Sequence, residues 1–288
     1  MTQSRQNFTL SDGRNLEYLT NGLKSDSAVI LHAGTTQDIT GWQTWLDYLA
    51  SKHIFALSIG RSGYAGSTKK DGRITIDIAH DVAELASHLG INKFVNIGLS
   101  GGGQHAIATG LDSRSAGVVT VGSLAPFDEM GDDFYTGMQQ ADLDEYADAI
   151  KDINLLVKRF QKWQDGDVGE TIVGAELSDR DKLASSKPTW KVTLDSCAYT
   201  MEQGWDWVAD DYSSYLKPWG FDPRDINVPT VIWQAELDKN VPIQHGKWLA
   251  AHMPNSRLEI GEGETHLGLF VNYEEEIMQS AIALLTSS

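Results

Sequence analysis

The chain has 288 residues, 41% of them hydrophobic, which is enough for a sizeable core in one large domain or two small ones. Its 40 acidic and 23 basic residues give a formal net charge of −17, which repels phosphate backbones and anionic lipids and so argues against nucleic-acid and membrane partners. A single cysteine, Cys197, allows no internal disulfide, and no Cys/His cluster has metal-ligand spacing, so we expect no metal or cofactor. No apolar run is long enough for a membrane span or a secretion signal, so we expect a cytoplasmic protein.

The first predicted element is an antiparallel hairpin. Residues 7–10 and 15–19 flank the segment Ser-Asp-Gly-Arg at 11–14, which is typical of a turn. This pair of strands is expected at an edge of the sheet.

Short apolar runs then alternate with helical patterns along the chain. Buried strands are predicted at residues 28–31, 53–57, 94–97, 117–121, 230–233 and 257–260. Helices are predicted at residues 42–49, 76–89, 103–108, 243–252 and 273–285. This alternation indicates a mostly parallel sheet covered by helices on both faces.

The segment at 98–102, Gly-Leu-Ser-Gly-Gly, lies between a predicted strand and a predicted helix. In that context Gly-x-Ser-x-Gly forms a tight turn that exposes its serine, because glycines allow strand and helix to approach closely. Ser100 is therefore the candidate nucleophile.

Residues 127–221 interrupt the alternation. They contain no strand-like run, and apolar side chains at three- to four-residue spacing between 143 and 160 predict a helical insertion. Its acidic character, 15 acidic against 7 basic residues over 127–187, is typical of a solvated face, and its five tryptophans are expected to pack the insertion together.

Polar residues follow the last two strands. Glu236 and Asp238 come after the strand at 230–233, and His266 follows the strand at 257–260. A serine needs a base, and the base needs an orienting group, so side chains at neighbouring strand ends can assemble a catalytic site with Ser100. The acid role is open at this stage between Asp238, Glu236 and Asp128, which follows another strand.

Three segments together resemble the α/β-hydrolase superfamily: the serine turn, Asp-x-x-Val-Pro at 238–242 and Gly-x-x-His-x-Gly-Leu at 263–269. The resemblance implies the α/β-hydrolase fold, a twisted, mostly parallel sheet with helices on both faces and a helical cap. The core is then residues 1–126 and 222–288, and the cap is residues 127–221. The position before Val-Pro assigns the acid role to Asp238 rather than Glu236, with Ser100 and His266 completing the triad.

The resemblance extends to two loops near the expected site. His32-Ala33-Gly34 is similar to the family's oxyanion loop, which implies that the backbone N–H groups of Gly34 and Gly101 hold the oxyanion. His32 is expected to orient that loop through hydrogen bonds. The glycine-rich segment at 60–67 resembles the family's loop beneath the site, and we assign no chemistry to its Arg61.

The predicted function is hydrolysis of a carboxylic ester through a Ser-His-Asp triad and an acyl-enzyme, on a small or medium acyl substrate. One alternative is an aminopeptidase similar to proline iminopeptidases, whose acidic lid holds the substrate's amino terminus. Another is a ligand-sensing protein of this fold with little turnover. Carbon–carbon bond hydrolysis, perhydrolysis and lyase chemistry fit the same triad. An epoxide hydrolase or a haloalkane dehalogenase is disfavoured, because resemblance to those enzymes would call for Asp rather than Ser100 at this turn. The sequence leaves the oligomeric state open.

Overall fold

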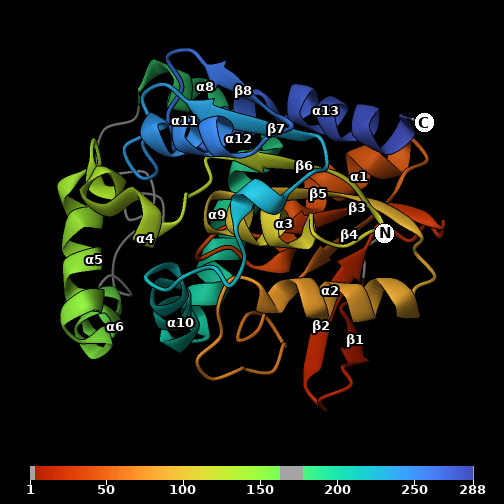
Figure 1. The fold of residues 1–288 in the computed structure, drawn as a ribbon, viewed down its shortest axis with the longest axis horizontal. Coiled ribbons are helices and arrows are strands. Elements are labelled where there is room, and N and C mark those ends of the chain that lie inside the picture. Colours follow the sequence, from red (N-terminus) through yellow and green to blue (C-terminus); the bar gives the residue numbers. More distant parts are fainter. Residues whose placement is uncertain (1–3, 163–177, 288) are drawn as a thin grey trace.

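A computed structural model describes residues 4–162 and 178–287. Its strands form one eight-stranded sheet in the order β1-β2-β4-β3-β5-β6-β7-β8 (Figure 1). The strands are β1 Gln6–Thr9, β2 Asn15–Thr20, β3 Ser27–His32, β4 Phe55–Ile59, β5 Lys93–Leu99, β6 Ser115–Val121, β7 Thr230–Ala235 and β8 Ser256–Gly261. Each predicted strand is thus found, with small shifts at its ends.

The sheet is antiparallel at one edge and parallel elsewhere. β1 pairs with β2, and β2 with β4, in antiparallel register, which confirms the predicted edge hairpin. From β4 through β3, β5, β6 and β7 to β8 all pairs are parallel, so these strands end at one edge of the sheet. Loops that follow the parallel strands therefore lie close together.

Helices cover both faces, as predicted. They are α1 Gln43–Ser51, α2 Asp77–His88, α3 Gly103–Thr109, α11 Ile243–His252, α12 His266–Asn272 and α13 Glu274–Thr286. Side chains alternate along each strand: Val29 and Val95 pack in the cluster that contains Trp45 of α1 and Ile277 of α13, whereas neighbouring residues face α2 and α3. Burial on both faces explains why the strands are continuous apolar runs.

The segment between β6 and β7 is helical in its described residues, 127–162 and 178–221, which contain no strand. We call residues 127–221 the cap segment; its helices are α4 Phe127–Met130, α5 Gln140–Lys151, α6 Ile153–Gln161, α8 Asp179–Ser185, α9 Pro188–Glu202 and α10 Asp206–Tyr215. In Figure 1, α5 and α6 lie at the left of the molecule, and α10 lies to the right of α6. Trp163, one of the five tryptophans, lies outside the described residues.

The helical pattern at 143–160 is divided between α5 and α6. Asp152 has extended backbone angles, φ −166° and ψ 117°, and its carboxylate accepts a hydrogen bond from the N–H of Asn154. Apolar spacing alone does not detect this break, because the apolar residues of both helices pack into one cluster. The local signal for the break is an Asp that caps a helix.

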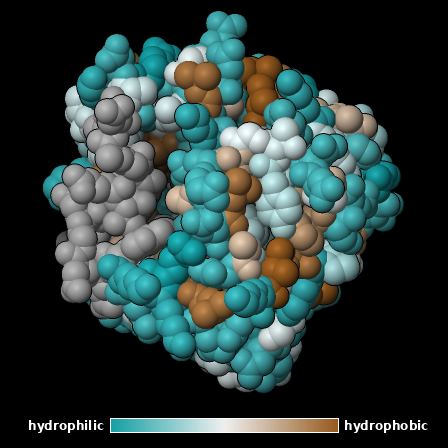
Figure 2. Space-filling model, turned by 90° about the vertical axis from the view of Figure 1, so that its left-hand side faces the viewer, coloured by the Kyte–Doolittle hydropathy of each residue, from teal (hydrophilic) through white to brown (hydrophobic). Residues whose placement is uncertain are grey.

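The surface over α5 and α6 is largely hydrophilic, with small separate hydrophobic patches (Figure 2). None of the helices in the described ranges has the length and apolar character that a bilayer span requires.

Candidate active site

The backbone turns sharply between β5 and α3. Ser100 has a φ of 51°, a left-handed conformation that non-glycine residues seldom adopt, and it begins the short 3₁₀ turn Ser100–Gly102. The strand therefore ends with its serine held in a strained position at the edge of the sheet, as the Gly-x-Ser-x-Gly pattern predicts.

The glycines of this turn permit close backbone contact. A Cβ atom at Gly98 would overlap the carbonyl oxygen of Gly102 and lie 2.7 Å from the Cα of Gly103. A Cβ atom at Gly102 would overlap the carbonyl oxygens of His32 and Ala33. Neither position therefore has room for a side chain.

Asp238 and His266 are brought together by the loops after β7 and β8. The imidazole Nδ1 of His266 lies 2.6 Å from Oδ2 of Asp238. The other carboxylate oxygen of Asp238 accepts hydrogen bonds from the N–H groups of Asn240, at 2.9 Å, and Val241, at 2.8 Å. These bonds fix the carboxylate, and its pairing with Nδ1 leaves Nε2 of His266 for a reaction partner.

His266 is the first residue of helix α12, not a residue of an open loop as the sequence suggested. Thr265 caps this helix, since its hydroxyl accepts from the N–H of Gly268 at 3.2 Å. On the opposite side, Gly122 follows β6 with a φ of 58°, and a Cβ atom there would lie 2.8 Å from Cε1 of His266. The imidazole is thus held between a capped helix and a glycine that leaves room for it.

Burial and charge act in opposite directions on His266. Burial lowers the pKa of the imidazole, but the Asp238 carboxylate, its hydrogen bond and the charge of Asp142 together raise it above the ordinary value of 6.5. No hydrogen bond joins Ser100 to His266 among the described residues. Such contacts are often long in unliganded enzymes and shorten when substrate binds.

The loop after β3 carries the predicted oxyanion donor Gly34. A Cβ atom on Gly34 would lie 3.5 Å from Cβ of Ser100, so this loop is next to the candidate nucleophile. The N–H of Gly34 donates to Oε1 of Gln37 at 3.1 Å. The N–H group that would bind an oxyanion at Gly34 therefore already donates to the side chain of Gln37.

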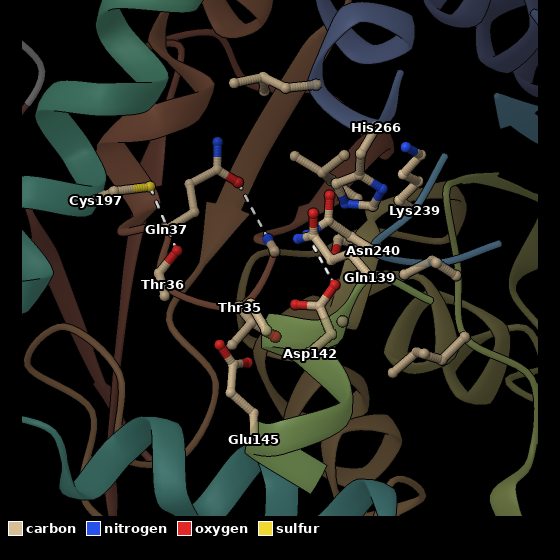
Figure 3. A pocket seen from close by; sticks show the side chains of 18 of the residues that line it. Thr35, Thr36, Gln37, Gln139, Asp142, Glu145, Cys197, Lys239, Asn240 and His266 are labelled. Atoms are coloured by element: carbon tan, nitrogen blue, oxygen red, sulfur yellow. Dashed lines mark hydrogen bonds between the residues drawn. The ribbon is translucent and has the colours of Figure 1, made fainter. Parts of the chain in front are cut away.

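Ser100, His266, Gly34 and Gln37 line a cavity of about 730 Å³ (Figure 3). From the loops after the strands it is lined by residues 34–37, 99–101, 237, 239–241 and 265–267. From the cap segment it is lined by residues of α5, α6, α8, α9 and α10. Ser100 and His266 thus face one cavity between the core and the cap segment. Its volume is typical of a site for a small molecule.

One wall of the cavity is acidic. In Figure 3, Asp142 and Glu145 project from α5, and both line the cavity. Asp142 accepts a hydrogen bond from the side-chain amide of Asn240 at 3.2 Å. Burial raises the pKa of Asp142 to about 7 and, together with the charge of Asp142, that of Glu145 to about 8. The cap segment therefore contributes two carboxyl groups that ionise near neutral pH.

Other candidates from the sequence lie elsewhere. Glu236 accepts from the N–H of Gly263, so it braces a turn rather than facing His266. Asp128 lies at the start of α4 and is not among the residues that line the cavity. A further histidine, His105 of α3, was not a candidate; it is buried, and neither ring nitrogen has a hydrogen-bond partner in the described residues. Nε2 of His32 lies 3.2 Å from Oδ1 of Asn96 on β5, which fixes this side chain to the sheet. The prediction that His32 orients the oxyanion loop by hydrogen bonds is therefore wrong for the described residues.

Several residues around the site were not predicted from the sequence, namely Gln37, Asp142, Glu145, Asp211 and Tyr215. Arg61 was assigned no chemistry, yet its guanidinium donates to the carbonyl oxygens of the oxyanion loop. For Gln37 the signal is its place three residues after Gly34, but nothing local to Asp211 points to a contact 150 residues away. Within residues 4–162 and 178–287 no group of three or more Asp, Glu, His or Cys side chains is arranged to bind a metal ion.

Comparison with known proteins gives consistent matches over most of the chain. Residues 27–273 match a family model described as alpha/beta hydrolase fold. The non-heme haloperoxidase of Rhodococcus erythropolis is 25% identical over 268 residues, which cover 90% of this chain and 91% of the relative.

Solved structures are similar over their full length. A thermophilic esterase from Thermogutta terrifontis, with malate bound, has a TM-score of 0.71 at 17% identity and is matched over 100% of its chain by 99% of this one. The enol-lactonase of Burkholderia xenovorans LB400 also has a TM-score of 0.71, at 15% identity, with 98% of this chain and 100% of that chain covered. At these identities the likeness demonstrates a shared fold.

Proposed function

The chain belongs to the alpha/beta hydrolase family, and on that premise we propose that it is a serine hydrolase of carboxylic esters. In this proposal Ser100 is the nucleophile, His266 is the general base and Asp238 orients His266. The observation that carries it is the 2.6 Å contact of His266 with Asp238 at a cavity that Ser100 also lines. Esterase and enol-lactonase neighbours support an acyl substrate.

The reaction begins when Nε2 of His266 accepts the hydroxyl proton of Ser100 and the oxygen attacks the ester carbonyl. Asp238 stabilises the imidazolium that forms, and the tetrahedral intermediate places its negative oxygen at the backbone N–H groups of Gly101 and the oxyanion loop. His266 then gives its proton to the leaving alcohol, which departs. A water molecule, deprotonated by His266, attacks the acyl-enzyme, and the acid is released.

For Gly34 to serve as an oxyanion donor, its N–H must leave Oε1 of Gln37. A negatively charged oxygen is a better acceptor than a neutral amide, so the exchange is favourable as charge develops in the transition state. The N–H of Thr35, in the next peptide, makes no hydrogen bond within the described residues and is available without this exchange.

The first test is labelling with a small fluorophosphonate, read by intact mass. We expect one adduct on the native protein and none on Ser100→Ala, because the reagent modifies activated serines. Ser280→Ala, on α13 away from the cavity, is the matched control and should label like the native protein. An adduct that persists on Ser100→Ala, or a native protein that neither labels nor hydrolyses short-chain aryl esters, would reject the proposal.

Asp142 and Glu145 favour a second candidate, an aminopeptidase for short peptides. An ammonium group beside two carboxyl groups would favour their ionised forms and be held by them. Comparing aminoacyl arylamides with aryl esters on the same leaving group separates the two functions. Preference for the arylamide, lost in Glu145→Gln with the ester rate retained, would support the aminopeptidase.

A further inference from the structure

We propose that Arg61 and Asp211 position the backbone N–H donors of the oxyanion hole from outside the cavity. Through Asp211, helix α10 of the cap segment then takes part in turnover. Neither residue lines the cavity, so both act through the loop after β3 as positioning residues. The inference rests on the proposed function, because it concerns how the same site would stabilise its oxyanion.

Arg61 holds two successive peptide groups. It follows β4, is 4% exposed, and donates from Nη1 to the carbonyl oxygen of Ala33 at 2.6 Å and from Nη2 to that of Gly34 at 3.3 Å. A charged, planar donor that contacts two adjacent carbonyls fixes their directions more firmly than a neutral single contact.

Those carbonyls are bonded to the two N–H groups in question. In a planar trans peptide the C=O of Ala33 points opposite to the N–H of Gly34, and the C=O of Gly34 points opposite to the N–H of Thr35. Arg61 therefore sets the direction of both candidate oxyanion donors. Arg61 thus orients the donor whichever of the two N–H groups binds the oxyanion.

Asp211 holds Arg61 in turn. This carboxylate is 0% exposed and accepts from Nε of Arg61 at 2.9 Å, from a second nitrogen of Arg61, from Arg73, and from the hydroxyls of Tyr64 and Tyr215. Burial opposes ionisation of Asp211, but the two guanidinium groups outweigh it and keep its pKa well below the ordinary value. One residue of α10 thus offsets part of the positive charge of two buried guanidinium groups, Arg61 and Arg73, beneath the oxyanion loop.

A second connection runs from α10 to the same loop. The hydroxyl of Tyr215, which donates to Asp211 at 2.7 Å, lies 2.6 Å from Oγ1 of Thr35. Both hydroxyls pack against Gly101, where an added Cβ atom would overlap each of them. The network therefore contacts both sides of the expected oxyanion hole, the loop after β3 and the residue after Ser100.

The principal test is Arg61→Lys, assayed on an aryl ester and with a trifluoromethyl ketone inhibitor. An ammonium group keeps the charge for Asp211 but cannot span two carbonyls as a guanidinium does. Loss of one oxyanion donor typically costs about 10²–10³ in turnover, so misalignment should cost about 10- to 100-fold in kcat, with KM changed less than about threefold. The inhibition constant of the ketone, which forms a tetrahedral oxyanion on Ser100, should rise by the same factor.

Asp210→Asn is the matched control. Asp210 is the neighbour of Asp211 on α10 and pairs with Lys69 at 3.0 Å, but it contacts neither Arg61 nor the oxyanion loop. Its kcat and its ketone inhibition constant should equal those of the native protein. Tyr215→Phe, which removes only a hydroxyl, keeps the test valid if Arg61→Lys does not fold, and we expect its kcat to fall about 3- to 10-fold with a parallel rise in the inhibition constant.

Endpoint labelling by a fluorophosphonate counts the folded sites in each preparation, so that kcat refers to competent enzyme. If Arg61→Lys and Tyr215→Phe keep native kcat and ketone affinity and lose only thermal stability, the network merely anchors α10 and the inference is wrong. If the native protein neither labels nor turns over esters, the proposed function fails, and this inference falls with it.

Discussion

At the residue scale, the chemistry depends on how the protein sets the protonation of His266. Asp238, in contact with Nδ1, and Asp142, across the cavity on α5, both raise its pKa, while burial lowers it. Asp142 has its own pKa raised to about 7 by burial, and its charge is one of the groups that raise the pKa of His266, so the two groups are electrostatically coupled. The cap segment thus acts on the base through charge without touching it.

We expect Asp142→Asn to move the acidic limb of the pH–rate profile to lower pH. His266 must be neutral to accept the proton of Ser100, so activity is lost as pH falls through its pKa, and removing a nearby negative charge lowers that pKa. The measurement is kcat/KM on an aryl ester from pH 5 to 9. Asp144→Asn, also on α5 but outside the cavity lining, should leave the midpoint in place, and an unchanged midpoint in Asp142→Asn would contradict the prediction.

At the element scale, the strands and the serine turn could be predicted because their signals are local. Buried strands such as β3 and β7 are short apolar runs, and the glycines around Ser100 have a steric reason that the sequence displays directly. The contact of Asp211 with Arg61 could not be predicted, since it depends on how α10 packs against the core. Asp238 and His266 were predicted as partners of Ser100 from chain order and family resemblance. The Gly-x-Ser-x-Gly spacing at 98–102 is more direct evidence, because all its residues lie in one turn.

The serine turn gives a steric prediction. Gly98→Ala places a methyl group against the backbone of residues 102 and 103, which cannot move without shifting Ser100, so we expect a loss of about 1–3 kcal/mol in stability and most of the esterase activity. For a protein of this size such a loss lowers Tm by several degrees, on the order of 3–10 °C.

Gly34→Ala is the control for stability alone. Its φ is not in the left-handed region, and its Cβ atom would make ordinary contacts of 3.4–3.5 Å with Leu99 and Ser100. Its Tm should therefore stay close to the native value in differential scanning calorimetry. Equal Tm values for the two variants would show that the turn relaxes more easily than its geometry implies.

At the scale of the whole molecule, a buried carboxyl group that the cap segment contributes to the cavity lowers the stability of the fold. Glu145 is buried against α10, where its carboxyl group accepts a hydrogen bond from Tyr212, and its pKa is raised from 4.5 to about 8. A chain with a net charge of −17 has many exposed positions for acidic residues, so a buried one needs another reason. Binding of a ligand in the cavity is such a reason, because binding sites keep residues that selection for stability alone would replace.

Glu145→Gln should raise Tm more at pH 8 than at pH 5. Below the unfolded pKa of about 4.5, Glu145 is protonated in both states, and its ionisation does not affect the free energy of unfolding. Between pH 4.5 and about 8 the unfolded chain ionises while the folded protein keeps the proton, so stability falls as pH rises. Glutamine keeps an acceptor for Tyr212 and removes this dependence. Glu202→Gln, an exposed change on α9, is the control, and an equal Tm gain at both pH values would contradict the prediction.

The same titration distinguishes the two functions through stability. An ammonium ligand beside Glu145 favours the ionised carboxylate in the folded state, which lowers its pKa and returns the stability lost at pH 8. A neutral ester analogue has no such preference. The Tm gain from an amino-acid amide should therefore be larger at pH 8 than at pH 5 and vanish in Glu145→Gln if the cavity binds an amine. A gain that persists in Glu145→Gln would place the amine elsewhere and favour the esterase.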